Sequence, residues 1–375
     1  MNTRKRLAPL LLSLCLILAG SWIVPSGKAV AKTALLLPHV LTNAPSPLKW
    51  LSRPPIREVV RYPAGDAEVV AEVFRPQDDG RHGAIIFSLG VTANFQDPDL
   101  IRVAEGLARL GVVVMVPHSE DLAQGRLHPR AADALVSAFE YLQTQAFVDP
   151  QRIGYAGFCV GSSLALVAAE DPRINAEVAF VSVVGGYYDV FDVGHAVLTQ
   201  RIRYNGRDQI WRPAHQTAEV FVRYLVDGVQ DSQDRMILAQ FLASEQPSHK
   251  ELQALSPTGR WVYQFLTADD PEQVEILMTR LPSDEVAKLR RLSPSTGIDR
   301  LRAKVFILQD PNDPFIPPTE TRHLADSLAE DIEWSYAELR LFQHVRPTRP
   351  LDKMSYLGDV ARLYRHLYHV MREVG

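Results

Sequence analysis

The chain has 375 residues, of which 46% are hydrophobic and 22% charged, and its formal net charge at pH 7 is -4. This length and apolar content are sufficient for a large buried core. The nearly balanced charge, without a basic or acidic run, excludes the electrostatic features of nucleic-acid-binding proteins and of disordered acidic tails. We therefore expect a globular protein that does not bind nucleic acid.

The N-terminal segment, residues 1–31, has the features of a secretory signal peptide. Basic residues precede an apolar run at residues 7–18, and Ala29-Val30-Ala31 forms a small-x-small cleavage pattern. The alternative is an uncleaved membrane anchor, because residues 7–24 are long enough to cross a bilayer. Both interpretations predict a globular part outside the cytoplasm, either secreted or periplasmic, or held at a membrane by this segment.

The chain has two cysteines, Cys15 and Cys159. Cys15 lies in the apolar run of the N-terminal segment, so Cys159 is the single thiol of the predicted globular part. No intramolecular disulfide can form there, although the expected compartment permits disulfides. Cys159 is therefore either a buried inert residue or a reactive thiol.

A proline-rich lead-in at residues 32–56 is expected to wrap or tether rather than to pack as a domain. From residue 57 the pattern changes to short apolar strands that alternate with amphipathic helices. Such alternation predicts an α/β fold with a mostly parallel sheet covered on both faces. The expected strands are residues 58–62, 67–74, 83–90, 112–116, 152–157 and 178–184, and the expected helices are 99–110, 129–145 and 164–170.

The alternation stops near residue 193, and residues 193–292 have helical patterns without an evident strand. It resumes with an expected strand at 304–309, a helix at 318–328, a strand at 338–342 and a helix at 357–371. The sequence thus predicts one core, residues 57–192 and 293–375, with an inserted helical cap. Because ligands of open α/β sheets bind at the carboxyl ends of the strands, the insertion is interpreted as a lid, with passive packing as the alternative.

Cys159 lies at the centre of Gly157-Phe-Cys-Val-Gly161, between an expected strand and an expected helix. A nucleophile on such a turn is lifted above the sheet, and flanking glycines remove side chains that would clash. The helix N-terminus behind it favours a thiolate or an oxyanion. A buried cysteine in an ordinary strand-to-helix turn is the structural alternative.

A thiol nucleophile needs a base, and a histidine base needs a carboxylate to orient its ring. His344 follows an expected strand and begins a loop, from which its imidazole can swing over the cleft. The loop after the strand at 304–309 offers two acids. Asp313 is favoured because it lies deeper in the loop, and Asp310 remains the alternative.

The order nucleophile, acid, histidine and the Gly-x-Cys-x-Gly turn resemble the α/β-hydrolases, and most closely their dienelactone hydrolase branch. The resemblance extends over residues 57–192 and 293–372 and includes the helix-strand pattern of 104–117 and the acid loop of 310–317. It implies an oxyanion hole formed by the amide of Val160 and by that of Leu89 or Val91. Ser88-Leu89-Gly90 replaces the family's usual His-Gly in that second loop, and compact members of the family lack the long insertion.

These features predict an exported hydrolase that cleaves a carboxylic ester, a lactone or a thioester through Cys159, Asp313 and His344. The expected partner is a small acyl substrate, and no metal or other cofactor is expected. Two alternatives remain: an acyltransferase with the same three residues, and a catalytically silent binding protein of the same fold.

Overall fold

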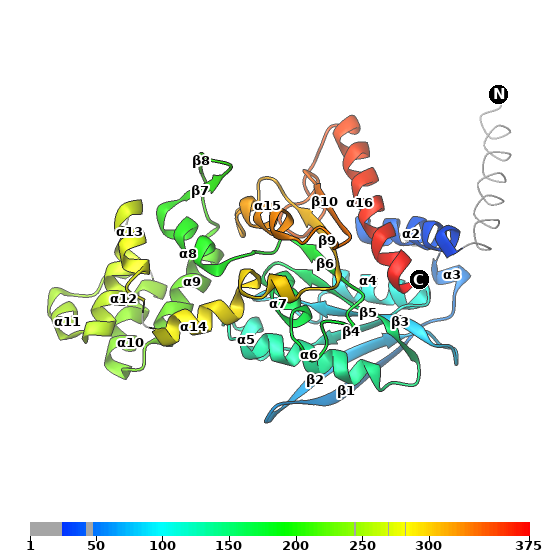
Figure 1. The fold of residues 1–375 in the computed structure, drawn as a ribbon, viewed down its shortest axis with the longest axis horizontal. Coiled ribbons are helices and arrows are strands. Elements are labelled where there is room, and N and C mark those ends of the chain that lie inside the picture. The colour runs from blue at the N-terminus through cyan, green and yellow to red at the C-terminus, as the bar shows by residue number, and fades with distance from the viewer. Residues whose placement is uncertain (1–24, 43–47, 244, 269, 282) are drawn as a thin grey trace.

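The computed structural model describes residues 25–375 except 43–47, 244, 269 and 282. Its centre is an eight-stranded sheet in the order β1-β2-β4-β3-β5-β6-β9-β10 (Figure 1). β1 pairs antiparallel with β2, and β2 pairs antiparallel with β4. The remaining neighbours in the sheet, from β4 through β3, β5, β6 and β9 to β10, are parallel. The strands are β1 (Ile56–Ala64), β2 (Ala67–Arg75), β3 (His82–Ser88), β4 (Val113–Pro117), β5 (Val148–Phe158), β6 (Phe180–Val184), β9 (Lys304–Gln309) and β10 (Trp334–Glu338).

Helices cover both faces of this sheet, as its nearly continuous apolar strands require. One face carries α4 (Pro98–Arg109) and α16 (Lys353–Val374), and the other carries α6 (Arg130–Gln143), α7 (Val160–Ala169) and α15 (Pro318–Ser327). The short helices α3 (Leu48–Leu51) and α5 (Glu120–Ala123) lie in connections, as do the 3-10 turns Pro294–Thr296 and Ile298–Arg300. The predicted α/β layering is therefore confirmed.

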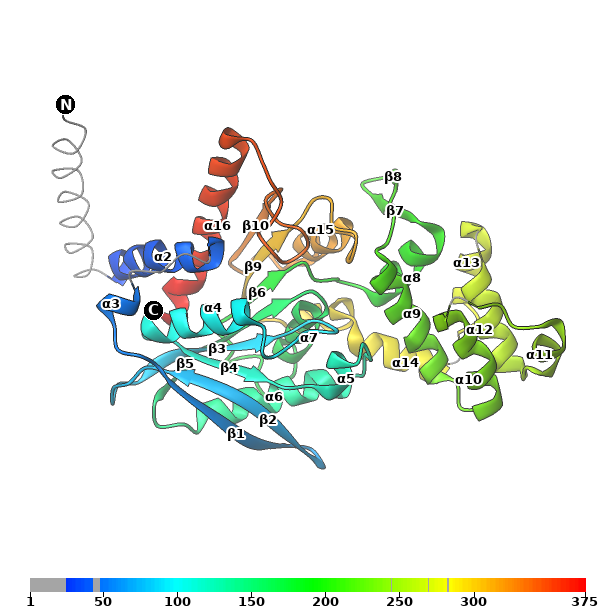
Figure 2. The ribbon, with the colours of Figure 1, turned by 180° about the vertical axis from the view of Figure 1, so that it is seen from behind.

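Residues 25–41, at the end of the predicted signal segment and the start of the lead-in, form a helix, α2 (Pro25–Leu41), that packs on the core. It lies against α16 and α4 in both views of the ribbon (Figures 1 and 2). Ala29, Ala31 and Leu36 are buried in this contact, so small residues that suggest a cleavage site also suit close helix packing. No helix in the described part of the chain is long and apolar enough to cross a membrane. The apolar run at 7–18 lies outside the described residues.

The insertion between β6 and β9 forms a lobe beside the core, with an apolar centre of its own (Figure 2). The predicted boundary at residue 193 falls within the first helix of the insertion, α8. Its elements are α8 (Val190–Thr199), β7 (Arg201–Tyr204), β8 (Arg207–Ile210), α9 (His215–Gly228), α10 (Ser232–Leu238), a 3-10 turn (Ala239–Ala243), α11 (His249–Ala254), α12 (Pro257–Thr267), α13 (Pro271–Met278) and α14 (Ser283–Leu292).

The expectation of a purely helical insertion is wrong at β7 and β8, which form an antiparallel hairpin. Its turn is Asn205-Gly206, with φ of 50° and 71°, a dipeptide that favours two-residue hairpin turns. The two strands are only four residues long; β7 (RIRY) alternates polar and apolar residues before Asn205-Gly206, a local hairpin signal, whereas β8 (RDQI) is fully exposed and does not alternate.

The strand expected at 338–342 is also wrong, because β10 ends at Glu338. The amide of Leu339 still donates to the carbonyl of Gln309, but the chain then turns. Leu339, Leu341 and Phe342 are buried in a small cluster with residues of α16. Their apolar pattern therefore reflects packing below a helix rather than pairing in the sheet.

α16 brings a histidine into the core. His366 is 5% exposed, and its Nε2 lies 2.8 Å from Oγ of Ser182 on β6. Burial, reinforced by the charge of His369, lowers the pKa of His366 from 6.5 to about 3. The folded protein therefore keeps this ring neutral, whereas the unfolded chain protonates it below about pH 6.5.

This difference predicts a specific loss of stability in acid. Between about pH 6.5 and pH 3 the unfolded state binds one more proton at His366, so the free energy of unfolding falls as pH falls. We expect His366→Gln to remove about 2 kcal/mol of this loss at about pH 5. Urea unfolding of both proteins at a series of pH values measures it; parallel pH profiles for the two would contradict the assignment.

Candidate active site

Cys159 lies between the end of β5 and the start of α7, with φ of 55° and ψ of -136°. This left-handed backbone is rare for a residue with a side chain, and such strain is concentrated at functional sites. The turn is held by the amide of Cys159, which donates to the carbonyl of Val184 at 2.9 Å. The elbow expected from the sequence is thus formed, with its side chain partly exposed.

The two framing glycines are required by close backbone approaches. A Cβ on Gly161 would lie 2.1 Å from the carbonyl oxygen of Ser88, and one on Gly157 would lie 2.3 Å from Cα of Ser162. The hydroxyls of Ser162 and Ser163 are fully buried and pair with backbone groups of Val184 and Tyr187. These serines connect α7 to the end of β6 and to the loop after it.

His344 and Asp313 are brought together from two different loops. Nδ1 of His344 lies 2.7 Å from Oδ2 of Asp313, and both side chains are buried. The other carboxylate oxygen of Asp313 accepts the amides of Phe315 and Ile316, at 2.8 and 3.2 Å. Asp313 therefore occupies the position of the orienting acid predicted from the sequence.

The ring of His344 is fixed rather than free to swing as expected. It occupies a tight turn closed by Gln343 and Arg346, with φ of 60°. The Phe315 ring stacks on it with centroids 4.7 Å apart. A fixed base loses less conformational entropy on reaching its reactive geometry than a mobile one, so this arrangement is preorganised.

The electrostatics of His344 depend on its two neighbours. Burial by itself lowers the pKa of this ring, but the charge of the adjacent Cys159 thiolate and the hydrogen bond with Asp313 outweigh it and raise the pKa to about 10. Nε2 is buried and has no hydrogen bond of regular geometry to any described residue. This nitrogen, beside the sulfur, is available to exchange a proton with it or with a substrate.

Asp310, the alternative acid, has a different role in the structure. Its carboxylate forms two hydrogen bonds with the guanidinium of Arg349, at 2.8 and 2.7 Å, and accepts the backbone amide of His344 at 3.1 Å. It therefore holds the histidine turn without contacting the ring nitrogens. Arg349 has no neighbouring motif that would reveal this contact in the sequence.

The predicted oxyanion donors lie around the sulfur. Val160 is the first residue of α7, so its amide has no acceptor within that helix. The loop with Leu89 and Val91 approaches from the end of β3, and a Cβ on Gly90 would lie 2.7 Å from Cβ of Cys159. Leu89, Val91 and Val160 all line the cavity next to Cys159. Which of the first two donates remains a prediction.

A cavity of about 820 Å³ opens at Cys159 and His344 and is lined mostly by apolar side chains. The insertion contributes part of its wall, and the interpretation of this insertion as a lid stays a prediction. Tyr224 on α9 lines this cavity, and its hydroxyl is buried with no hydrogen-bond partner among the described residues. The insertion also supports the acid loop, because Nε1 of Trp211 donates to the carbonyl of Asp313 at 2.7 Å. Neither residue is marked by a sequence motif.

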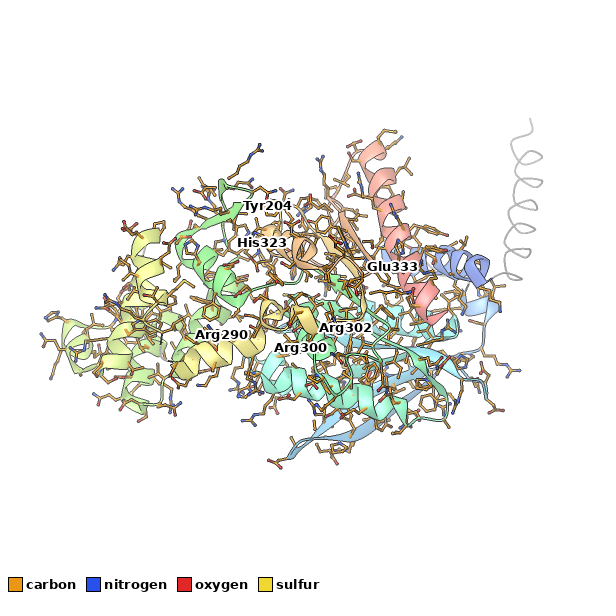
Figure 3. The ribbon with its side chains drawn as sticks, in the orientation of Figure 1. Tyr204, Arg290, Arg300, Arg302, His323 and Glu333 are labelled. Carbon is orange, nitrogen blue, oxygen red and sulfur yellow. The ribbon has the colours of Figure 1, made fainter. Side chains whose placement is uncertain are left out.

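A second group of ionisable residues lies away from Cys159. Asp192, Glu320 and His323 place oxygen and nitrogen atoms within 4.8 Å of one another, a donor set that suits a divalent cation. Burial, together with the charge of Asp192, raises the pKa of Glu320 to about 8. His323 lies beside Tyr204 of the β7–β8 hairpin (Figure 3), with ring centroids 5.5 Å apart. This group does not contribute to the site around Cys159.

Comparisons with known proteins concern the fold and one segment of the chain. Residues 90–186, which include the Gly90 loop and the cysteine turn, match the family model "Dienelactone hydrolase family". The chain has 18% sequence identity to a puromycin-hydrolyzing peptidase of Mycobacterium tuberculosis, with a TM-score of 0.50 over 86% of this chain and 39% of that one. A fungal esterase structure from Rhizomucor miehei also gives 0.50, at 12% identity over 86% of each chain. These two likenesses show the fold, and the predicted α/β-hydrolase architecture is confirmed.

Curated proteins are similar in sequence to shorter segments of this chain. The "Putative phosphoribosyl transferase Rv0571c" of Mycobacterium tuberculosis (strain ATCC 25618 / H37Rv) is 29% identical over 178 residues, which are 45% of this chain and 39% of that protein. The "Probable 2-oxo-3-(5-oxofuran-2-ylidene)propanoate lactonase" of Bradyrhizobium is 29% identical over 128 residues, 31% of this chain and 52% of that protein. The chain thus spans about two fifths to half the length of these curated relatives.

The contrast between the two acids can be tested by alkylation of Cys159 with iodoacetamide at neutral pH. Asp313→Asn removes the charged partner that supports a protonated His344, so less thiolate is stabilised and the rate should fall about tenfold or more. Asp310→Asn should lower the melting temperature but change the rate less than about threefold, because Asp310 contacts only the backbone of His344. Equal alkylation rates for the two variants would contradict these roles.

Proposed function

We propose that this chain, an α/β-hydrolase-fold protein with a dienelactone hydrolase-type segment at residues 90–186, hydrolyses carboxylic esters or lactones through Cys159. The observation that carries the proposal is the placement of His344 between the sulfur and a buried carboxylate at 2.7 Å. The helix N-terminus behind the sulfur favours an anionic nucleophile. The apolar cavity in front of the sulfur favours a reaction site with little water.

In the proposed reaction the thiolate of Cys159 attacks the carbonyl carbon, and the carbonyl electron pair moves to oxygen. The amide of Val160 and one of Leu89 or Val91 would stabilise this oxyanion, an interaction typically worth roughly 3 kcal/mol for each donor. When the C–O bond breaks, Nε2 of His344 gives its proton to the leaving alkoxide. The acyl group then remains on sulfur as a thioester.

The second half of the reaction uses the same groups, with His344 now acting as a base instead of an acid. Neutral His344 removes a proton from a water molecule, and the resulting hydroxide attacks the thioester carbonyl. Collapse of the second tetrahedral intermediate releases the carboxylic acid and leaves the thiolate paired with the imidazolium. Asp313 holds the ring so that Nε2 faces the sulfur throughout, and its charge stabilises the imidazolium.

The family match and the named lactonase relative support ester-type bonds as the target, because a lactone is a cyclic ester. Acyl transfer would use the same first half-reaction, with an alcohol or amine in place of water. A silent binding protein would not require a fixed and preorganised histidine, so the fixed turn at His344 favours an enzyme.

We further propose that the N-terminal segment stays attached and holds the protein at a membrane outside the cytoplasm. Cleavage after Ala31 would remove about two turns of the packed helix α2. Those turns contribute the buried Ala29 and a carbonyl of Val30 that accepts the hydroxyl of Tyr364 at 3.0 Å. The small residues at 29–31 are explained by this packing as well as by a cleavage pattern.

The enzymatic proposal predicts that the protein hydrolyses p-nitrophenyl acetate and that the activity depends on the thiol. Cys159→Ala should lose turnover by about a thousandfold or more, because the variant lacks the sulfur that accepts the acyl group. Brief exposure to substrate at low pH, followed by mass spectrometry, should reveal the acyl group on the peptide that contains Cys159.

The matched control is Ser162→Ala, which removes a neighbouring hydroxyl that pairs with the backbone of Val184. It should lower stability but keep an acylated Cys159. Turnover that persists in Cys159→Ala and disappears in Ser162→Ala would overturn the assignment of the nucleophile. Product formed only when an alcohol or amine is added would identify acyl transfer instead.

The anchoring proposal predicts that the protein extracted from its native membrane retains residues before Ala31, as read by mass spectrometry of its N-terminal peptide. A truncated form that begins at Lys32 should melt several degrees lower, because the contact of α2 with α16 is incomplete. A native protein that begins at Lys32 and melts at the same temperature as the full chain would refute retention.

A further inference from the structure

The cavity at Cys159 extends to both sides of the sheet edge. On one side it is lined by the insertion, including Phe221, Tyr224 and Phe265. On the other side it continues between the sheet and the helices α4, α16 and α2. We name this second extension the sheet arm. Phe158, the residue that precedes the nucleophile, lines the same cavity as Cys159. A group bound in the sheet arm can therefore extend to the reacting sulfur.

Two small residues form the floor of the sheet arm. Ala156 on β5 and Ser182 on β6 are direct partners in the parallel pairing of these strands, and both line the cavity. On the same face the neighbouring strand β3 carries the larger Ile85 and Phe87. The pairing of two small side chains in the middle of a sheet leaves space that the helices above do not fill.

The roof and end of the sheet arm are aliphatic. They are formed by Leu36 and Val40 of α2, Leu107 of α4, and Val370 and Met371 of α16. Most of these side chains are less than 7% exposed, so the arm is shielded from solvent. An apolar space of this kind loses packing contacts when it is empty and binds apolar groups readily.

The polar groups near the sheet arm do not suit a charged ligand. Ser182 and His366 are paired at 2.8 Å, and His366 is neutral at ordinary pH. The charged side chains that line the cavity near α4 form ion pairs with one another: Asp99 with Arg102 and Asp97 with Arg346. A carboxylate or phosphate in the arm would therefore lose its hydration without gaining a charged partner, since the buried Nδ1 of His366, which has no hydrogen-bond partner among the described residues, belongs to a neutral ring.

We propose that the sheet arm binds a long aliphatic chain of the substrate, so that the protein acts on hydrophobic esters rather than on small polar lactones. This inference rests on the proposed ester hydrolysis at Cys159. The chain can belong to the acyl part or to the alcohol part of the ester, and the two sources are distinguished experimentally. Either source places the scissile carbonyl at the sulfur and the hydrocarbon below α2 and α16.

The experiment compares kcat/KM for p-nitrophenyl acetate, butyrate, octanoate and decanoate, and for decyl acetate against ethyl acetate. For the chain that occupies the arm, kcat/KM should rise by up to about fourfold for each added methylene until the arm is filled. A rise in the p-nitrophenyl series alone identifies the acyl chain, and a rise with decyl acetate alone identifies the alcohol chain.

Two variants fill the sheet arm from opposite walls, Ala156→Leu from the floor and Leu367→Trp from α16. Each should reduce the preference for the long chain over the short one by roughly 10- to 50-fold while keeping acetate hydrolysis. Ala131→Leu makes the same side-chain change on α6, away from the cavity, and should leave the preference unchanged. A preference that both arm variants retain would overturn the inference.

Calorimetric binding of decanoate to Cys159→Ala gives a readout that does not depend on turnover. The inference expects binding that is lost when Ala156→Leu is added. Acetate hydrolysis through Cys159 without any chain preference would keep the proposed function and overturn the arm. Decanoate binding at Ala156 without hydrolysis of any ester would keep the arm and overturn the proposed function.

Discussion

The site depends on one backbone constraint, the left-handed turn at Cys159 between β5 and α7. The chain can hold φ of 55° there because Gly157 and Gly161 have no side chains and lie against the backbone of Ser162 and Ser88. The same contact brings the loop after β3 to the sulfur, so the nucleophile and the predicted oxyanion donors are positioned together. A Cβ at Gly161 would lie 2.1 Å from the carbonyl oxygen of Ser88, so a side chain there would prevent this close approach of the loop to the turn.

The second requirement is the placement of buried charge. Asp313 is 1% exposed, and such a carboxylate is costly unless it is hydrogen-bonded. Two backbone amides and His344 satisfy it, so the folded protein itself favours a protonated ring beside the sulfur. Asp310 and Arg349 fix the turn from outside. Asp310 and Asp313, three residues apart, thus have separate roles: Asp313 pairs with the ring of His344, and Asp310 with its backbone amide.

Helix α2 links the N-terminal segment to the site. It packs on α16 and α4, and it forms part of the roof of the sheet arm. Retention of the N-terminal segment, as proposed, would keep the contact of α2 with α16 complete, and it would hold the cavity near a membrane, where hydrophobic esters are concentrated. The insertion covers the other side and supports the acid loop through Trp211.

The sequence alone determined the α/β alternation, the cysteine turn and the order of Cys159, Asp313 and His344, because these depend on local patterns of apolar, glycine and turn residues. It could not determine the packed α2 or the end of β10, since there the burial of a residue is set by distant elements. The β7–β8 hairpin did have a local signal, Asn205-Gly206 after an alternating strand, but its second strand is exposed and has no apolar pattern. The roles of Arg349 and the shape of the sheet arm likewise arise only in the tertiary structure. Paired small residues on neighbouring strands leave a cavity only when helices from both ends of the chain lie above them.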